Sequence, residues 1–410
     1  MRKYISLIAL AMVVFSAAAI TKPGVEVLRD NGFKQLAGKR VGLITNPTGV
    51  DNDLKSTIDI LHEAKNVELV ALFGPEHGVR GDVHAGDEFN NTVDPATGVQ
   101  VYSIYGKTKK PTAEMLKGID ALVYDIQDIG CRSFTFVSTL GLALEACAEN
   151  GVELVVLDRP NPLGGNRVEG NLVEKGFESF VSQFPIPYLY GLTPGEMARF
   201  LNGERLVAGG KQAKLTVVPM EGWTRDMTFE KTGMPWVLPS PHIPQPVTSY
   251  YYPATGILGE LYYVSIGVGY TLPFQLICAE WIDADKFAKN MNALNLPGVK
   301  CRPLHIKPFY STGVGKNLQG IQFYIEDTPE SSITLLQFYA MQELAKMYPD
   351  KRIFDTATDK KRFDMFDKVC GTSKIREMFS KNYLVSDIVD YWNKDVESFK
   401  AKSSKYYLYK

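Results

Sequence analysis

A glutamate at the end of an apolar run is the strongest candidate for proton-transfer chemistry in this sequence. The segment 74–78 reads Gly-Pro-Glu-His-Gly and carries Glu76 at its centre. Glycines let the backbone turn tightly, so such a segment leaves a carboxyl group at the tip of a strand. A carboxyl group at that place can act as a general acid and protonate a leaving oxygen. The alternative for Glu76 is a salt bridge to Arg80 or a hydrogen bond that stabilises the turn.

A pair of aspartates offers a second acidic group. Asp125 and Asp128 follow the apolar run 121–124. A carboxylate that faces Glu76 there could hold an attacking water, stabilise positive charge on a sugar or orient a substrate acetamide. Helix capping is the favoured role for Asp128. For Asp125 the sequence favours a functional role.

Several other polar side chains are candidates for substrate binding. Arg80, Arg132 and Arg159 each follow a predicted strand by a few residues, and a guanidinium group suits a bound carboxylate. The alternative for each arginine is an ion pair with a neighbouring aspartate. The further candidates for polar contacts are Asn46, His77, His84, Gln127, Asp128, Asp158, Asn161, His242 and Glu260. The histidines lack the spacing of metal ligands, so no metal site is predicted.

Aromatic residues gather around residues 188–252, where the chain is expected to cross between domains. Flat aromatic faces suit sugar rings, and the alternative is packing in the core. These residues are Tyr188, Tyr190, Trp223, Trp236, Tyr250, Tyr251 and Tyr252.

Apolar runs that alternate with amphipathic stretches predict the elements that position these groups. The predicted strands cover 41–44, 68–72, 101–104, 121–124 and 153–157, and the predicted helices cover 54–64 and 134–149. Continuous apolar strands that alternate with helices indicate a doubly wound parallel sheet of the α/β class. Ligands bind beyond the carboxyl ends of such strands. We therefore expect the polar groups after the strands to converge on one crevice.

The second half of the chain predicts a smaller α/β or α+β domain. Thr193 is a plausible cap for a helix at 193–206, and residues 234–244 are too rich in proline for regular structure. The further predicted strands cover 214–219, 275–281 and 320–325, and the further predicted helices cover 283–294, 331–347 and 386–399. The predicted domains are 20–235, which carries the catalytic groups, and 236–410, which completes the cleft.

The first residues predict export. Arg2 and Lys3 precede an apolar run from Ile5 to Ala19 that closes in small residues, which is typical of a secretory signal peptide at 1–19. A retained membrane anchor is the alternative, although the run is short for a bilayer span. No early cysteine offers a site for lipid attachment. We expect a periplasmic or secreted protein that is not inserted in the membrane once the signal is removed.

Composition excludes several classes of partner. Lys+Arg 45 and Asp+Glu 46 nearly balance, so nothing suggests nucleic acid binding. No cofactor is expected, because the first strand leads into neither a dinucleotide-binding glycine pattern nor a phosphate-binding loop. The five cysteines lack close pairing, and buried thiols are favoured over a disulfide framework.

At these motifs the sequence resembles the exo-β-N-acetylmuramidase family typified by NamZ, which was long catalogued as a domain of unknown function. The similar stretches are 43–46 (LITN), 72–81 (LFGPEHGVRG), 124–130 (YDIQDIG), 157–165 (LDRPNPLGG) and 239–241 (PSP). The resemblance covers nearly all of the mature chain. It implies a Rossmann-like domain joined to a smaller C-terminal domain, with the site in the cleft between them and Glu76 as the leading catalytic residue.

One stretch departs from the family pattern. Many members carry a Glu-Gly-Thr-Asn segment and then a Gly-Arg-Gly turn, whereas this chain reads Glu-Leu-Tyr-Tyr at 260–263 and Gly-Val-Gly at 267–269. Val268 thus replaces an arginine that the family places near the substrate.

The favoured hypothesis is hydrolysis of terminal β-linked N-acetylmuramic acid in peptidoglycan fragments, with Glu76 as general acid. Asp125 is then either the second carboxylate or the group that orients the substrate's 2-acetamido oxygen. The rival hypothesis, motivated by Val268, is a catalytically weak paralogue that binds muropeptides or wall sugars. Hydrolysis of an ester or amide lacks support, because no Gly-x-Ser-x-Gly elbow is present.

Overall fold

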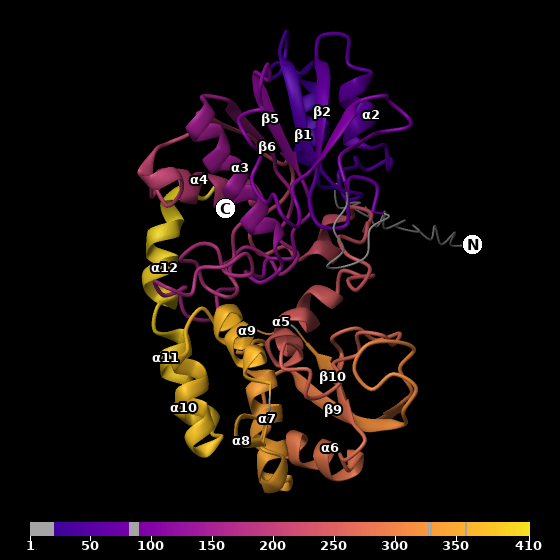
Figure 1. Cartoon of the computed structure of the whole chain (residues 1–410), viewed down its shortest axis with the longest axis vertical. Helices are drawn as coiled ribbons and strands as arrows, with labels where there is room; N and C mark the ends of the chain where they lie inside the picture. The colour runs from indigo at the N-terminus through magenta and orange to yellow at the C-terminus, as the bar shows by residue number, and fades with distance from the viewer. Residues whose placement is uncertain (1–19, 82–89, 327, 329, 357–358) are drawn as a thin grey trace, which may run out of the picture.

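The computed structural model of the chain describes residues 20–81, 90–326, 328, 330–356 and 359–410. The predicted signal peptide and His84 lie outside these residues. The described residues form two lobes that are stacked along the long axis of the molecule (Figure 1). The first lobe contains the larger sheet, and the second lobe contains a smaller sheet flanked by helices.

Within the described residues the first lobe has a seven-stranded sheet in the order β3-β4-β2-β1-β5-β6-β7. All neighbours pair in parallel except β3, which pairs antiparallel with β4. The strands are β1 (Arg40–Thr45), β2 (Glu68–Gly74), β3 (Thr92–Val93), β4 (Gln100–Ser103), β5 (Ala121–Asp125), β6 (Glu153–Leu157) and β7 (Leu215–Val218). The predicted parallel α/β sheet is therefore confirmed, and only the short strand β3 was not foreseen.

Helices cover both faces of this sheet, as a doubly wound fold requires. They are α1 (Gly24–Asp30), α2 (Thr57–His62), α3 (Phe136–Asn150) and α4 (Pro194–Gly203). Apolar residues of α1 and α2 pack with one set of strand side chains, and those of α3 and α4 pack with the other set. At the start of α4, Thr193 is the N-cap as predicted, and it forms a capping box with Glu196.

The strand order places a topological switch point between β1 and β5. The chain runs from β1 outward through β2 to β4 on one side, and from β5 outward through β6 to β7 on the other. In open α/β sheets the crevice at such a point, beyond the carboxyl ends of the strands, is the usual ligand site. The polar segments after β1 and β5 meet there.

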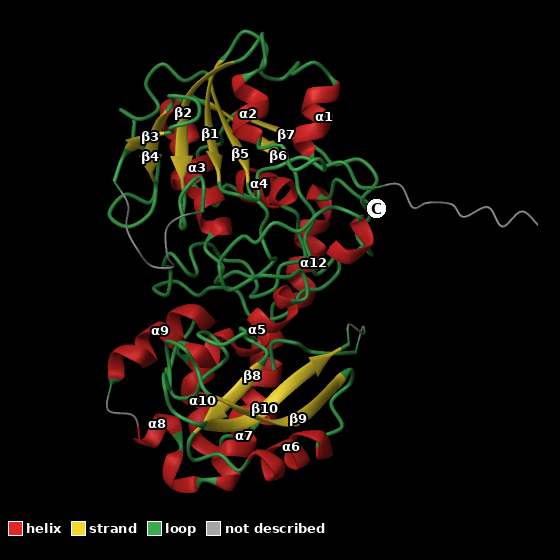
Figure 2. Ribbon diagram, turned by 90° about the vertical axis from the view of Figure 1, so that its right-hand side faces the viewer, coloured by secondary structure: helices red, strands yellow, loops and turns green. Residues whose placement is uncertain are grey.

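The second lobe has an antiparallel three-stranded sheet among the described residues, in the order β8-β10-β9 (Figure 2). Its strands are β8 (Leu276–Ala279), β9 (Val299–Ile306) and β10 (Leu318–Ile325). The helices that follow β7 are α5 (Thr248–Gly259), α6 (Ala284–Ala293), α7 (Leu336–Met347), α8 (Ile353–Thr356), α9 (Lys360–Cys370), α10 (Lys374–Asn382), α11 (Val389–Asn393) and α12 (Val396–Ser403). Short 3-10 helices cover Ala208–Gly210, Phe229–Thr232, Pro349–Lys351, Val385–Asp387 and Ser404–Tyr406.

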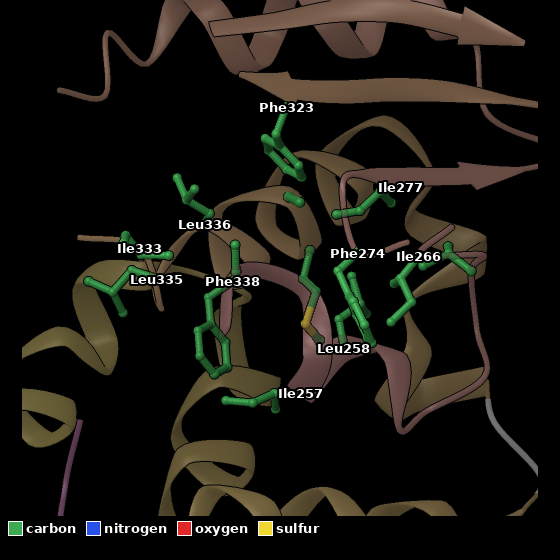
Figure 3. Close-up of a cluster of buried hydrophobic side chains, with 14 of the residues drawn as sticks. Ile257, Leu258, Ile266, Phe274, Ile277, Phe323, Ile333, Leu335, Leu336 and Phe338 are labelled. Atoms are coloured by element: carbon green, nitrogen blue, oxygen red, sulfur yellow. The ribbon is translucent and has the colours of Figure 1, made fainter. Parts of the chain in front are cut away.

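Side chains from α5, α7 and the small sheet form the core of the second lobe. Ile257 and Leu258 of α5 lie with Phe338 of α7 and with Ile277 and Phe323 of the sheet (Figure 3). All five cysteines lie in the described part of the chain, where they are buried and form no disulfide bond. The prediction of buried thiols is therefore confirmed. None of the helices in the described ranges is long and apolar enough to cross a membrane.

Several predictions for the second lobe need correction. The stretch 386–399 is not one helix, because a break near Asp395 separates α11 from α12. Strand β9 was missed because exposed residues interrupt its apolar pattern. The irregular segment 234–244 is confirmed, but α5 begins only a few residues later and carries Pro253 within it.

The last residues of the chain return to the first lobe. The Tyr409 hydroxyl donates to Asp158 Oδ2 over 2.5 Å, and the backbone N–H of Leu408 donates to Glu196 Oε1 over 2.9 Å. The backbone N–H of Arg225 donates to the carbonyl of Lys410 over 2.9 Å. Residues 406–410 therefore pack against α4 and the end of β6, although they follow the second lobe in sequence. The division at residue 235 stays a prediction.

Candidate active site

The carboxylate of Glu76 is held by hydroxyl groups from separate segments of the first lobe. Glu76 lies just beyond β2, before a turn in which His77 and Gly78 adopt left-handed φ values of 73° and 75°. The Tyr105 hydroxyl donates to Glu76 Oε1 over 3.0 Å, and the Thr135 hydroxyl donates to Glu76 Oε2 over 3.1 Å. These bonds fix the orientation of the carboxyl group, as a general acid requires.

Tyr105 and Thr135 were not among the predicted site residues. Tyr105 follows β4 by two residues, and Thr135 lies between β5 and α3. Both occupy segments beyond the carboxyl ends of parallel strands, which is the rule that selected Glu76. Applying this rule to hydroxyl groups as well as to charged groups would have found them.

Helix α5 brings the second lobe to this site through Tyr252. Ser133 Oγ donates to the Tyr188 hydroxyl over 3.0 Å and lies 3.2 Å from the Tyr252 hydroxyl. Burial raises the pKa of Tyr252 well above its usual value, and the Glu260 and Glu76 carboxylates raise it further. Tyr252 is therefore within electrostatic range of both acids, one from each lobe. Of the predicted aromatic group, Tyr188 and Tyr190 are instead buried core residues.

Glu260 caps the C-terminal end of α5 and is half-buried. Its carboxylate makes no hydrogen bond or ion pair with any residue in the described part of the chain. Burial raises its pKa, and the positive charge of Arg362 opposes this change. Gly256 lies between Tyr252 and Glu260 on the helix, and a Cβ there would meet only ordinary contacts, the nearest at 3.6 Å. The face of α5 between Tyr252 and Glu260 thus carries no intervening side chain.

His242 lies in the irregular segment between the lobes, and His77 lies in the turn after β2. The two histidine side chains interact electrostatically. Burial lowers the pKa of His242, and the positive charge of His77 lowers it further. His242 Nε2 is 2.6 Å from the Tyr310 hydroxyl, which belongs to the loop between β9 and β10. His242 therefore contacts the second lobe through Tyr310 and interacts electrostatically with the residue after Glu76.

The crevice at the switch point is filled by an internal ion pair. Arg159 Nη2 donates to Asp125 Oδ2 over 3.0 Å, Arg159 Nε donates to Oδ1, and the Thr57 hydroxyl also donates to Oδ2. The side chains of Arg159 and Asp125 are 3% and 0% exposed. Asp125 was expected to be a catalytic carboxylate and Arg159 to bind the substrate. In the structure the two charges instead neutralise each other away from solvent.

Asn46 and Gln127 belong to the same internal network. Asn46 Oδ1 accepts hydrogen bonds from the backbone and hydroxyl groups of Thr48, and the Thr48 hydroxyl accepts from the backbone N–H of Gln127. The Gln127 amide donates to the carbonyls of Asp128 and Pro160, each over 2.7 Å. The segments after β1, β5 and β6 do converge as predicted, but they bond mainly to one another.

The carboxylates of Asp128 and Asp158 satisfy backbone and hydroxyl donors. Asp128 Oδ1 accepts from the backbone N–H of Gly130 over 3.0 Å within a loop, so Asp128 does not cap a helix as predicted, and burial raises the pKa of Asp128 to about 7. Asp158 accepts from the backbone N–H of Gly195 over 2.7 Å and from the Thr193 hydroxyl over 2.8 Å. Burial raises the pKa of Asp158 to about 7. Both aspartates therefore anchor loops, and this differs from the expected contact with a substrate.

Asn161 is likewise a structural residue. Its Oδ1 accepts from the backbone N–H of Leu163 over 3.0 Å, and its Nδ2 donates to the carbonyl of Leu192 over 3.1 Å. A Cβ at Gly130, which has a φ of 78°, would lie 2.4 Å from Asn161 Oδ1. Asn161 thus packs against the loop after β5 and has no room for a substrate contact on that side.

Arg132 does not reach the site. Its guanidinium group is fully buried, where it donates to the carbonyls of Asn171, Ile186 and Val369 and to the hydroxyl of Ser182. Burial lowers the pKa of Arg132 to about 10. Because Val369 belongs to α9, this arginine links the lobes and cannot bind a substrate carboxylate as expected.

Arg80 is the predicted arginine that does reach solvent. It forms a bidentate pair with Asp94, with N···O distances of 2.9 and 3.0 Å, and its side chain is 36% exposed. A cavity of about 200 Å³ lies beside it and is lined by Asn46, Pro47, Gly49, Ser56, Ile58, Val79 and Arg80. Asn46 Nδ2 is buried and has no hydrogen-bond partner among the described residues. This cavity can accept a small polar or anionic group.

A larger cavity of about 580 Å³ lies between the lobes and is lined by residues that include Arg167, Glu169 and Ser331. Its buried charges are paired, because Arg167 binds Glu169 and Arg225 binds Glu196. The charges buried in this cavity are therefore neutralised, and Glu76 stays the candidate for the acid. No cluster of His, Cys, Asp or Glu that could hold a metal ion occurs among the described residues.

The chain is similar to known proteins over most of its length. Residues 41–247 match the N-terminal part, and residues 250–409 the C-terminal part, of the family described as exo-beta-N-acetylmuramidase NamZ. The peptidoglycan beta-N-acetylmuramidase NamZ of Bacillus subtilis (strain 168) is 43% identical over 386 residues, which cover 94% of this chain and 91% of that protein.

Crystal structures of DUF1343 family proteins from Bacteroides fragilis NCTC 9343 share the fold. One is 60% identical, with a TM-score of 0.92, and the match covers 95% of this chain and 99% of that chain. Another is 27% identical, with a TM-score of 0.74, and the match covers 96% of this chain and 99% of that chain.

Proposed function

This chain belongs to the exo-β-N-acetylmuramidase NamZ family of glycosidases, and from that membership we propose that it releases terminal β-linked N-acetylmuramic acid from peptidoglycan fragments, with Glu76 as general acid. The observation that carries the assignment of Glu76 is its position. Its carboxyl group is oriented by Tyr105 and Thr135 beyond the end of β2, within electrostatic range of Tyr252 from the second lobe.

The chemistry follows from this placement. Glu76 donates its proton to the glycosidic oxygen, the bond from that oxygen to the anomeric carbon breaks, and positive charge develops on the sugar ring. Water then supplies the oxygen that completes hydrolysis. The hydroxyl groups of Tyr105 and Thr135 keep the carboxyl group in one rotamer, so no reorganisation is needed as the proton moves.

Glu260 replaces Asp125 as the candidate for the second carboxylate. The Asp125 carboxylate is saturated by Arg159 and Thr57, whereas Glu260 is half-buried and unpaired within the described residues. As a general base, Glu260 takes the proton of the attacking water and the configuration inverts. If the 2-acetamido group attacks instead, Glu260 orients that group and the configuration is retained. The anomeric configuration of the first product, measured by NMR, distinguishes these routes.

Arg80 is the candidate residue for binding the lactyl carboxylate of muramic acid. Its guanidinium group lines the 200 Å³ cavity a few residues from Glu76, together with Asn46, whose amide nitrogen has no hydrogen-bond partner among the described residues. A guanidinium group that already binds Asp94 retains further N–H donors for a substrate carboxylate.

The place of action that we propose is the periplasm or the extracellular space. The predicted signal peptide at 1–19 supports this proposal, and peptidoglycan fragments occur in these compartments. Fractionation of cells that produce the full chain tests it, since we expect soluble protein without residues 1–19. Protein that retains Met1 to Ala19 in the membrane fraction would contradict it.

A chromogenic β-glycoside of N-acetylmuramic acid tests the function directly. The wild-type protein should release the dye, and Glu76→Gln should abolish this release while the melting temperature stays the same. Glu63→Gln is the matched control, because Glu63 is an exposed glutamate of the same lobe with a side chain that is 61% exposed. Dye release that survives Glu76→Gln would remove Glu76 as the acid. A wild-type protein that binds the glycoside without cleaving it would support the rival hypothesis of a wall-sugar-binding paralogue.

A further inference from the structure

The loop between β9 and β10, residues 307–317, exposes two aromatic side chains and a valine. Phe309 is 72% exposed, Tyr310 is 51% exposed and Val314 is 55% exposed. The Phe309 ring stacks on Tyr270, with ring centroids 6.1 Å apart and an interplanar angle of 19°. Exposed aromatic rings that gather on one loop usually mark a binding surface. We call residues 307–317 the aromatic loop.

The aromatic loop is held in place by its backbone. The backbone N–H of Phe309 donates to the carbonyl of Gly269 over 2.8 Å. Gly269 has a φ of 89°, and a Cβ at this position would lie 2.0 Å from the carbonyl oxygen of Tyr310. Only glycine fits there, so the turn at 267–270 and the aromatic loop form one preorganised unit. Its rings are exposed although their support is rigid.

The aromatic loop connects to the acid of the first lobe. The Tyr310 hydroxyl is 2.6 Å from His242 Nε2, and the charge of His77 acts on His242. His77 directly follows Glu76. The same loop that presents Phe309 to solvent therefore contacts His242, whose ring interacts electrostatically with the residue next to the proton donor.

We propose that the aromatic loop binds the sugar residue on the leaving-group side of the scissile bond, with Phe309 as a stacking platform and Tyr310 as a polar contact. This inference rests on the proposed function and extends it to the part of the glycan that the enzyme does not release. An exo-acting enzyme encloses the terminal sugar, whereas the rest of the glycan must extend across an open surface of the protein. The exposure of Phe309 and Tyr310 suits contact with this extended part of the glycan, because aromatic faces suit sugar rings.

Kinetics with matched substrates test the proposal. One substrate is the aryl β-glycoside of N-acetylmuramic acid, which has no second sugar, and the other is a peptide-free glycan fragment with N-acetylmuramic acid at its end. Phe309→Ala should raise KM for the glycan fragment about tenfold and change kcat/KM for the aryl glycoside less than about twofold. Tyr310→Phe should weaken use of the glycan fragment selectively as well. Tyr324→Ala is the control, because Tyr324 is 48% exposed on β10 outside the aromatic loop.

Equal losses on both substrates, or an unchanged KM for the glycan fragment, would overturn the proposal. If the wild-type protein cleaves neither substrate, the proposed function fails and the aromatic loop is tested by calorimetric titration with the same glycan fragment. Weaker binding to Phe309→Ala than to Tyr324→Ala then supports the loop as a sugar-binding surface, and equal binding refutes it.

Discussion

Replacing Asp125 with asparagine should destabilise the protein without removing its chemistry. The Asp125 carboxylate is 0% exposed and is bonded to Arg159, which is 3% exposed. Asparagine keeps the size of the side chain but leaves the buried guanidinium charge uncompensated. Removing one member of a buried ion pair costs about 3–5 kcal/mol. For a lobe of this size each kcal/mol lowers the melting temperature by about 2–4 °C, so we expect a decrease of roughly 6–20 °C.

Thermal unfolding followed by circular dichroism, together with activity measured well below the lowered melting temperature, tests this expectation. Under those conditions kcat for the aryl glycoside should stay within about threefold of wild type. The double variant Asp125→Leu/Arg159→Met removes both charges and should recover part of the lost stability, because no charge is then left buried alone. A variant Asp125→Asn that melts like wild type but loses kcat by about a hundredfold or more would refute this reasoning and restore Asp125 as a catalytic group.

Other substitutions give distinct expected outcomes. Tyr105→Phe removes a hydrogen bond to Glu76 that is worth about 0.5–1.5 kcal/mol. The kcat should therefore fall about two- to tenfold, while KM stays nearly unchanged. An unchanged kcat would mean that Tyr105 does not position the acid. Arg80→Ala should reduce the preference for muramic acid over N-acetylglucosamine glycosides by about tenfold or more, and a preserved preference would place carboxylate recognition elsewhere. Because burial raises the pKa of Glu260 above its usual 4.5, its carboxylate is protonated at a higher pH than that of an ordinary glutamate, so kcat/KM should fall as the pH is lowered through this raised pKa. Glu260→Gln should lower activity and flatten that limb of the pH profile, and an unaltered limb would exclude Glu260.

The first lobe could be predicted well because its sheet is buried on both faces. Burial makes strands such as 121–125 and 153–157 continuous apolar runs, and the alternation of these runs with helices determines the class of fold. The second lobe was harder, since β9 has alternating exposed residues and a proline, and α5 tolerates Pro253 within its length. Local patterns do not reveal packing partners that arrive from distant segments.

The site was predictable only in part, for a related reason. The rule that ligands bind beyond strand ends selected Glu76, which lies at the tip of β2 and stays the predicted acid, and it also selected Asp125 and Arg159, which lie at equivalent positions. Sequence does not show which of these groups neutralise each other. Tyr252 was noted only as one of many aromatic residues, because its approach to Ser133 depends on how the lobes meet.

The return of residues 406–410 to the first lobe limits how independently that lobe can form. Asp158 at the end of β6 receives the Tyr409 hydroxyl, and Glu196 of α4 receives the backbone N–H of Leu408. During synthesis these two contacts cannot form until the whole second lobe has been made. A fragment that ends near residue 247 would therefore expose part of its own interior. The lobes are consequently poor candidates for exchange between proteins as separate modules, even though each has its own sheet.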